Sequence, residues 1–276
     1  MATSAQSTLG ILAGGGTLPR QVAEAAVKRG RAVFLVAFEG QHAPETVAGF
    51  PHIVLPIAKA GQIIKALKTA GVVDLVMAGG VRRPSLSELG LDWRGVQLFA
   101  KIGARALGDD GLLGAIGKEL ELEGFRLVGP RDILTGGTVA AGLLGRHTPD
   151  AQAEADISHG IKVAKILGAM DIGQAVIVQQ GLVLGVEAIE GTDALISRAG
   201  PLRRDGPGGV LVKIAKPQQD RRIDLPTIGP ATVERAASAG LRGIAVHAGN
   251  TLVLDREALI EAADAAGLFV IAMDID

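Results

Sequence analysis

The densest group of polar side chains in this 276-residue chain lies between residues 213 and 230, a segment that three prolines stiffen. Carboxylates are ligands that Mg²⁺ prefers, and cationic side chains offset the charge of phosphate groups. We therefore predict that Asp220 and Asp224 hold Mg²⁺, or that one of them orients a water molecule. Lys213 and Arg221 would then neutralise phosphate. The alternative is an exposed charged loop, the commonest place for such residues.

A run of three glycines separates an apolar segment at residues 9–13 from a helical pattern at residues 18–29. Glycine lets the backbone approach a ligand closely, and a helix N-terminus offers N–H groups and the positive end of its dipole. These features predict an anion or phosphate site at Gly14, Gly15, Gly16 and Thr17. The spacing matches neither the dinucleotide fingerprint nor the P-loop, so a tight turn without a ligand stays open.

A second glycine-rich loop follows the strand expected at residues 75–78. In a doubly wound sheet, ligands bind beyond the carboxyl ends of the strands. We predict that Gly79, Gly80 and Arg83 contact a nucleotide or diphosphate, because an arginine can bind phosphate through two parallel hydrogen bonds. A solvated surface turn is the alternative interpretation of this loop.

A third group of polar residues closes one expected strand and opens a short helix at residues 192–198. Glu190 and Thr192 are candidates for contacts to a metal ion or to sugar hydroxyls. A helix N-cap is an equally good interpretation of Thr192, since threonine side chains commonly accept hydrogen bonds from the first helical turn.

The composition narrows the chemistry that these residues can support. The chain has no cysteine, which excludes disulfides, zinc–thiolate sites and thiol nucleophiles. Its five histidines form no HxxxH or HxH pair, and no serine lies in a nucleophile elbow. Carboxylates, Mg²⁺ and cationic phosphate clamps remain, and they suit phosphoryl or nucleotidyl transfer to water.

The elements that would position these residues suggest two α/β domains. Strands and helices alternate over residues 1–132, which predicts a Rossmann-like domain with a parallel sheet. Residues 133–150 form the expected linker. Residues 151–276 form a mixed α/β (α+β) domain with catalytic residues, and hairpins are expected at residues 175–186 and 244–254. The ligand cleft is expected between the two domains.

Charge and hydropathy limit the partners. The formal net charge is −1 and no run of lysines or arginines stands out, so a nucleic-acid partner is not expected. No signal peptide and no apolar run of about 20 residues is visible, which predicts a protein that is soluble or at most peripheral to a membrane. The absence of cysteine is compatible with the cytoplasm.

Three stretches of the sequence resemble the LpxI family of UDP-2,3-diacylglucosamine pyrophosphatases. They are LAGGGTLP at residues 12–19, EAIEGTD at residues 187–193, and Lys213 with KPQQDRRIDLPTIG at residues 216–229. The third stretch is the most specific, whereas the glycine run alone would be a weak signal. Together they cover both halves of the chain in the order of the family.

The resemblance implies hydrolysis of the pyrophosphate of UDP-2,3-diacylglucosamine to 2,3-diacylglucosamine 1-phosphate (lipid X) and UMP, in lipid A biosynthesis. It also implies Mg²⁺, a homodimer, and water attack on the sugar-side phosphorus. The essential aspartate of the family matches Asp224. The expected location is the cytoplasm, with a peripheral contact to the inner membrane as an option for a substrate that carries acyl chains.

The chemistry of the residue types and the resemblance to the family together give each candidate residue a role. Asp224 is the expected metal ligand or base, Asp220 assists it, and Gln219 positions the water or a phosphate oxygen. Two other functions remain open: an ATP-dependent ligase or kinase, and a non-catalytic protein that binds a nucleotide-sugar. ATP would raise the melting temperature of the former, and Asp224→Ala would leave the latter functional.

Overall fold

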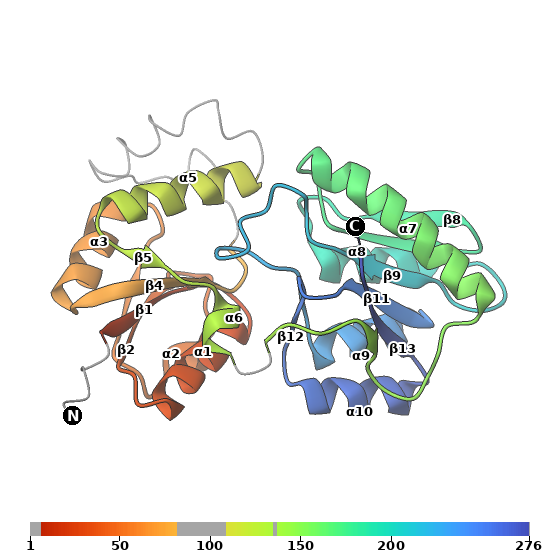
Figure 1. Cartoon of the computed structure of the whole chain (residues 1–276), viewed down its shortest axis with the longest axis horizontal. Helices are drawn as coiled ribbons and strands as arrows, with labels where there is room; N and C mark the ends of the chain where they lie inside the picture. Colours follow the sequence, from red (N-terminus) through yellow and green to blue (C-terminus); the bar gives the residue numbers. More distant parts are fainter. Residues whose placement is uncertain (1–6, 82–108, 135–136, 276) are drawn as a thin grey trace. The chain divides into compact units, whose positions relative to one another are not determined.

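The computed structural model describes residues 7–81, 109–134 and 137–275, and the chain divides into two compact units (Figure 1). The first unit comprises Met1–Thr135 and Asp220–Asp224, and the second comprises Gly136–Gln219 and Leu225–Asp276. The short segment Asp220–Asp224 therefore groups with the N-terminal unit, although we assigned it to the C-terminal domain from the sequence.

The first unit contains a five-stranded, fully parallel sheet in the order β3-β2-β1-β4-β5. This confirms the expected Rossmann-like sheet. The order reverses between β1 and β4, and doubly wound sheets bind ligands at such a switch point. Edge strand β3 escaped the sequence analysis, because its side chains are only exposed or half-buried. The strands are β1 (Thr8–Ala13), β2 (Val33–Phe38), β3 (His52–Leu55), β4 (Val72–Ala78) and β5 (Arg126–Leu127).

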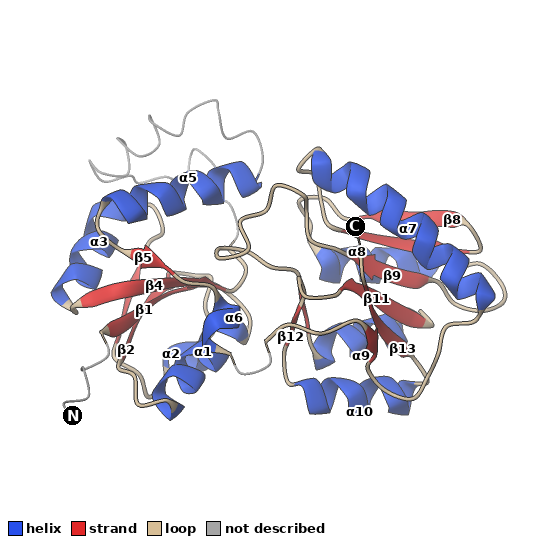
Figure 2. Cartoon of the chain, in the orientation of Figure 1, coloured by secondary structure: helices blue, strands red, loops and turns tan. Residues whose placement is uncertain are grey.

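Helices cover both faces of this sheet (Figure 2). One face packs against α1 (Leu18–Lys28), α2 (Pro44–Val47) and α6 (Pro130–Ile133), and the other against α3 (Ala60–Thr69) and α5 (Asp109–Leu122). Side chains alternate along β1, so Ile11 packs in the α1 cluster while Leu12 packs in the α3 cluster. The helix expected at residues 96–107 lies outside the described residues.

The second unit contains a six-stranded mixed sheet in the order β6-β13-β11-β9-β7-β8. Strands β9, β11 and β13 are parallel, whereas β7, β8 and β6 run antiparallel to their neighbours. This confirms a mixed α/β domain and the first expected hairpin, β7–β8. The strands are β6 (Gly142–Leu143), β7 (Ala175–Gln179), β8 (Leu182–Val186), β9 (Val210–Lys213), β11 (Gly243–His247) and β13 (Phe269–Met273).

The second expected hairpin is wrong. Strand β11 already pairs in parallel with β9 on one side and with β13 on the other, so no edge is left for a hairpin partner. The turn after His247 instead leads to β12 (Leu252–Val253), which pairs with β10 (Thr227–Ile228) in a separate parallel ladder. Strand β6 lies within the segment that we assigned to the linker, because it extends the sheet beside β13.

Helices also cover both faces of the second sheet. Helix α7 (Ala151–Ala169) packs on one face, and Gly160 lets it approach closely, because a Cβ atom there would lie 2.6 Å from Val212 Cγ2. The other face packs against α8 (Thr192–Ala199), α9 (Pro230–Ser238) and α10 (Arg256–Ala266), and the short 3-10 helix η3 (Gly200–Leu202) follows α8. In the ranges that the structure describes, every helix is too short or too polar to cross a membrane.

Candidate active site

The two glycine-rich loops of the first unit meet at the carboxyl ends of β1 and β4. The Gly15 amide donates to the Gly80 carbonyl at 2.7 Å, and the Gly80 amide donates back to the Gly15 carbonyl at 3.1 Å. The Gly14 amide donates to the Ala78 carbonyl at 2.9 Å. The loops thus adjoin, as predicted, but three of the amides expected to bind phosphate are used to join them.

The start of α1 is the part of this loop that best suits an anion. Gly16 has φ +84°, a conformation that glycine adopts without strain, and it turns the chain into the helix. Thr17 occupies the N-cap position, and within the described part of the chain its side chain makes no capping hydrogen bond. The positive end of the helix dipole is therefore not balanced by a side-chain cap, which favours a bound anion there.

The close approach of the loops makes Gly79 indispensable for stability. Gly79 has φ +86°, and a Cβ atom there would lie 2.3 Å from the Gly15 carbonyl oxygen, whereas a Cβ at Gly80 meets nothing within 4 Å. We expect Gly79→Ala to lower the free energy of unfolding by about 3 kcal/mol, and the matched control Gly80→Ala to change it by less than about 0.5 kcal/mol. Urea denaturation measures both, and equal stabilities would contradict this packing.

Lys213 is the last residue of β9 and is only 7% exposed. Its ammonium donates a hydrogen bond to the Thr227 carbonyl at 3.0 Å. A buried charge needs such partners, and the carbonyl fixes the ammonium at the carboxyl end of the strand. Open α/β sheets bind ligands at this end, so the position suits a cation that neutralises phosphate.

The loop after β9 is held by its own polar side chains. Gln219 is buried, and its Oε1 accepts a hydrogen bond from the Lys216 amide at 3.2 Å. The Lys216 ammonium forms an ion pair with Asp171 at 2.6 Å. Gln219 therefore braces the loop with this oxygen, and its predicted contact to water or phosphate stays a prediction.

Residues 220–224 form a tight turn that begins and ends with the two predicted catalytic aspartates. The amides of Ile223 and Asp224 both donate to the Asp220 carbonyl, at 2.9 and 3.0 Å. The Asp220 carboxylate accepts three hydrogen bonds from Arg222, at 2.8 to 3.1 Å. Hydrogen bonds from the Arg222 side chain are the main reason that the pKa of Asp220 is lowered. Arg222 is thus the main partner of Asp220, whereas Asp224 is half-buried at the end of the turn.

The donor set of this turn suits a magnesium ion only together with substrate. In the described ranges, no group of three or more histidine, aspartate or glutamate side chains could hold a metal. Mg²⁺ commonly uses one or two protein carboxylates and completes its shell with water and substrate phosphates. Asp224 can supply such a carboxylate. Asp220 could assist only with a carboxylate that also binds the Arg222 guanidinium.

The residues around Glu190 form a network of their own. Thr192 Oγ1 donates to Glu187 Oε1 at 2.5 Å, and Arg198 pairs with Glu190 at 2.7 Å. The N-cap of α8 is Gly191, with φ +81°, so Thr192 is the first helical residue and not the cap. Substrate contacts of Glu190 and Thr192 remain predictions, and Arg83 lies outside the described residues.

Two polar residues that we had not assigned to a site lie at the same edge of the second sheet as Lys213. His247 ends β11, the neighbour of β9, and Val246 pairs with Lys213. The Asn250 amide nitrogen lies 2.9 Å from His247 Nε2. Their position at the carboxyl end of a buried strand, His247 as its last residue and Asn250 in the turn after it, was the signal that could have found them, because carboxyl ends of parallel strands meet at one edge.

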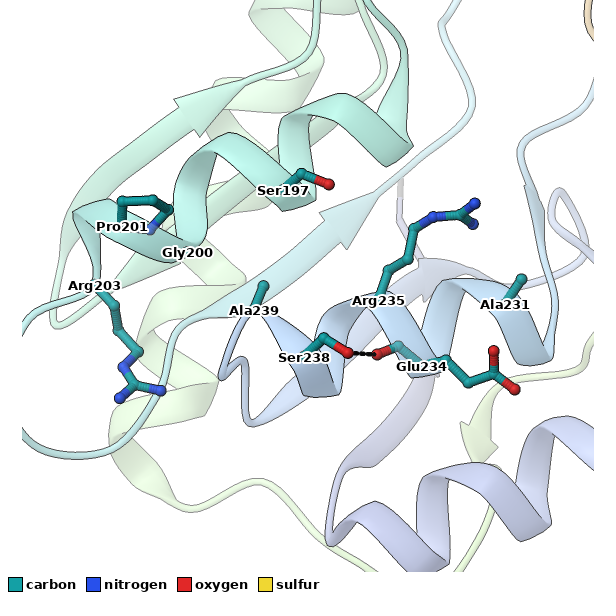
Figure 3. A pocket seen from close by; sticks show the side chains of 9 residues that line it. All are labelled: Ser197, Gly200, Pro201, Arg203, Ala231, Glu234, Arg235, Ser238 and Ala239. Carbon is teal, nitrogen blue, oxygen red and sulfur yellow. Dashed lines mark hydrogen bonds between the residues drawn. The ribbon is translucent and has the colours of Figure 1, made fainter.

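A hollow of about 660 Å³ lies elsewhere in the second unit, between the end of α8 and α9 (Figure 3). Arg203, Glu234 and Arg235 give it a polar lining, and Ser238 donates a hydrogen bond to the Glu234 carbonyl at 2.9 Å. Arg235 also pairs with Asp193 at 3.1 Å. None of the predicted site residues lines this hollow.

Comparison with known proteins gives one consistent match along the chain. The family models of the LpxI N-terminal domain and the LpxI C-terminal domain match residues 8–136 and 140–271. The UDP-2,3-diacylglucosamine pyrophosphatase LpxI of Caulobacter vibrioides is 43% identical over 273 residues. The alignment covers 96% of this chain and 97% of that protein, so the similarity includes both units.

Solved structures show only weak similarity. Thermus thermophilus UDP-glucose 4-epimerase in complex with NAD has a TM-score of 0.32 at 15% identity, over 98% of this chain and 85% of the epimerase. The ADP complex of purK, N5-carboxyaminoimidazole ribonucleotide synthetase, has a TM-score of 0.24 at 14% identity, over 67% of this chain and 39% of purK. Neither value establishes a common overall fold.

Proposed function

Because the chain belongs to the LpxI family, we propose that it is a UDP-2,3-diacylglucosamine pyrophosphatase of lipid A biosynthesis. It hydrolyses the pyrophosphate bond to 2,3-diacylglucosamine 1-phosphate (lipid X) and UMP. The observation that carries this proposal is the 43% identity to a pyrophosphatase of this specificity over 96% of the chain. The glycine loops, Lys213 and the turn of Asp224 supply residue types that the reaction needs.

The reaction places two demands on the protein. A diphosphate repels an attacking water oxygen, so cations must neutralise its negative charge, and the water must be oriented in line with the bond that breaks. Lys213 serves the first demand, assisted by the positive end of α1. Asp224 serves the second by accepting a proton from the water or by orienting it. The oxygen of the water joins one phosphorus, and the other phosphate leaves with the bridging oxygen.

Magnesium is part of the proposal. When bound, Mg²⁺ would withdraw charge from the diphosphate oxygens. Asp224, the half-buried aspartate at the end of the turn, is the carboxylate that we assign to hold it, and the Asp220 carboxylate accepts hydrogen bonds from Arg222. The acidic residues of the turn are too few for a metal cage made by protein alone, so the substrate is expected to supply part of the metal shell.

The proposal also includes a homodimer and a peripheral contact with the cytoplasmic face of the inner membrane. Exposed apolar side chains at the end of α7 support the membrane contact: Ile166 is 65% and Met170 is 68% exposed. Ile189 in the loop before α8 is 92% exposed. Such residues favour contact with a bilayer, where a substrate with two acyl chains would reside.

An assay of the full chain with UDP-2,3-diacylglucosamine in mixed micelles tests the function. We expect lipid X and UMP as products with MgCl₂ present, and a fall in rate of about 10²-fold or more in EDTA that added Mg²⁺ restores. In ¹⁸O-water, label in lipid X indicates attack on the sugar-side phosphorus. Release of UDP, or ATP turnover without UDP-sugar hydrolysis, would contradict the proposal.

A further inference from the structure

The turn that carries Asp224 is attached to the first unit by one apolar side chain. Ile223 is only 7% exposed and belongs to the cluster that α3, α5 and β5 form on one face of the parallel sheet. Ile223 is the one apolar residue of the segment Asp220–Asp224, and neither solubility nor the turn requires an isoleucine there. Its burial indicates that the segment Asp220–Asp224 is anchored by hydrophobic contact.

The pocket that receives Ile223 depends on a glycine in the middle of α5. A Cβ atom at Gly117 would lie 2.6 Å from Ile223 Cδ1 and 2.9 Å from Leu127 Cδ1. Glycine is unfavourable inside a helix, so the close seat of Ile223 gives a physical reason for its presence. By contrast, a Cβ atom at Gly114, one turn earlier, meets nothing within 4 Å.

A second contact fixes the orientation of the same turn. Arg222 Nη1 donates to Glu121 Oε1 of α5 at 2.9 Å, while the other nitrogens of Arg222 bind the Asp220 carboxylate. The backbone also fits closely, since a Cβ atom at Gly129 would lie 3.4 Å from Arg222 Cα. Apolar, ionic and backbone contacts therefore hold the turn against the end of α5 and the residues after β5.

From these contacts we infer that Ile223, seated against Gly117, is a positioning residue that sets the place of Asp224. The inference rests on the proposed role of Asp224 in hydrolysis. Asp224 is the next residue along the chain, and its amide is bonded to the Asp220 carbonyl within the anchored turn. A shift of Ile223 therefore moves the Asp224 backbone. Arg222 and Asp220 act in the same way, by fixing the turn.

The size of the expected effect follows from how catalysis depends on geometry. A displacement of about 1 Å in a catalytic group can lower a rate by about 10²-fold, while ground-state binding by other groups persists. Ile223 Cδ1 is the far end of a flexible side chain, so part of the collision with a new methyl group at residue 117 will relax. We therefore expect a smaller fall in kcat for this change, about tenfold.

Three variants of the full chain test the inference. Gly117→Ala adds the colliding methyl group, and Gly114→Ala is the matched control on the same helix. The double variant Gly117→Ala with Ile223→Val removes Ile223 Cδ1, the nearer of the two terminal side-chain atoms that the new methyl group would meet, and leaves Leu127 Cδ1 in place. Alanine is a better helix former than glycine, so neither single glycine substitution weakens α5 by itself.

The expected readout is a split between kcat and KM. Gly117→Ala should lower kcat about tenfold with KM within about twofold of wild type. Gly114→Ala should leave both unchanged, and the double variant should recover kcat to within about threefold of wild type. Full kcat in Gly117→Ala, or a double variant no faster than Gly117→Ala, would overturn the inference.

Hydrogen exchange separates this inference from the proposed function. The amides of Ile223 and Asp224 should exchange faster in Gly117→Ala than in wild type or Gly114→Ala, and the double variant should restore their protection. If the variants show this exchange pattern but the wild-type protein does not hydrolyse UDP-2,3-diacylglucosamine, the anchoring role of Ile223 stands and the proposed function is rejected. If the wild-type protein is active and Gly117→Ala has the exchange rates and the kcat of wild type, only the positioning role of Ile223 is rejected.

Discussion

Asp224→Ala is expected to lower kcat for UDP-2,3-diacylglucosamine by about 10³-fold or more, the largest effect of any single substitution proposed for this chain. The variant loses the carboxylate that would orient water and hold Mg²⁺ beside the diphosphate. Folding should persist, because the turn is anchored by Ile223 and Arg222, and the Asp224 amide can still donate to the Asp220 carbonyl. Substrate binding should persist as well.

Steady-state kinetics and thermal denaturation of three variants measure this effect. Asp205→Ala is the control for loss of an acidic side chain, since Asp205 is exposed in a loop without a proposed role. Asp220→Ala should lower kcat by only about tenfold, because Asp220 acts on the turn through Arg222. An active Asp224→Ala protein would remove this residue from the mechanism. Equal losses at both aspartates would instead indicate that both carboxylates act on the metal ion.

Lys213→Met is expected to lower kcat/KM by about 10²-fold, because removal of one preorganised cationic donor typically has an effect of this size. The ammonium is buried at the end of β9 and held by the Thr227 carbonyl, so it needs no rearrangement when the diphosphate arrives. Methionine keeps the length of the side chain and removes the charge. The carbonyl of Thr227 loses its donor, which should lower stability by about 1 kcal/mol.

The neighbouring Lys216 provides a matched control for Lys213. Its side chain is only 8% exposed, but its ammonium pairs with Asp171 and braces the loop after β9. We expect Lys216→Met to lower the free energy of unfolding and to change kcat/KM by less than about threefold. Urea denaturation and initial rates measure both variants. Wild-type kcat/KM in Lys213→Met, or a larger loss in Lys216→Met, would contradict the assignment.

Local sequence patterns were sufficient to predict an element where its hydrophobic periodicity and its flanking turn residues both lie within one short stretch of the chain. The glycine run between β1 and α1, the alternating elements of the first domain and the β7–β8 hairpin are of this kind. The motif around Asp224 indicated the family, because it combines many specified residues in one short stretch. Edge strand β3 lacks such a pattern, and the strand expected around Leu252–Val253 pairs with β10 and not with β11, since partners elsewhere in the chain define both pairings.

The sequence by itself determined the two α/β domains, the family, and the residue types available for the reaction. Only the tertiary structure decided what those residues contact. It joined Gly14 and Gly15 to the β4 loop, paired Asp220 with Arg222, and seated Ile223 against Gly117. The physical reason is that periodicity and turn preference act between close neighbours in the chain. Hydrogen-bond partners and packing pockets come from distant segments, which only the complete path of the chain brings together.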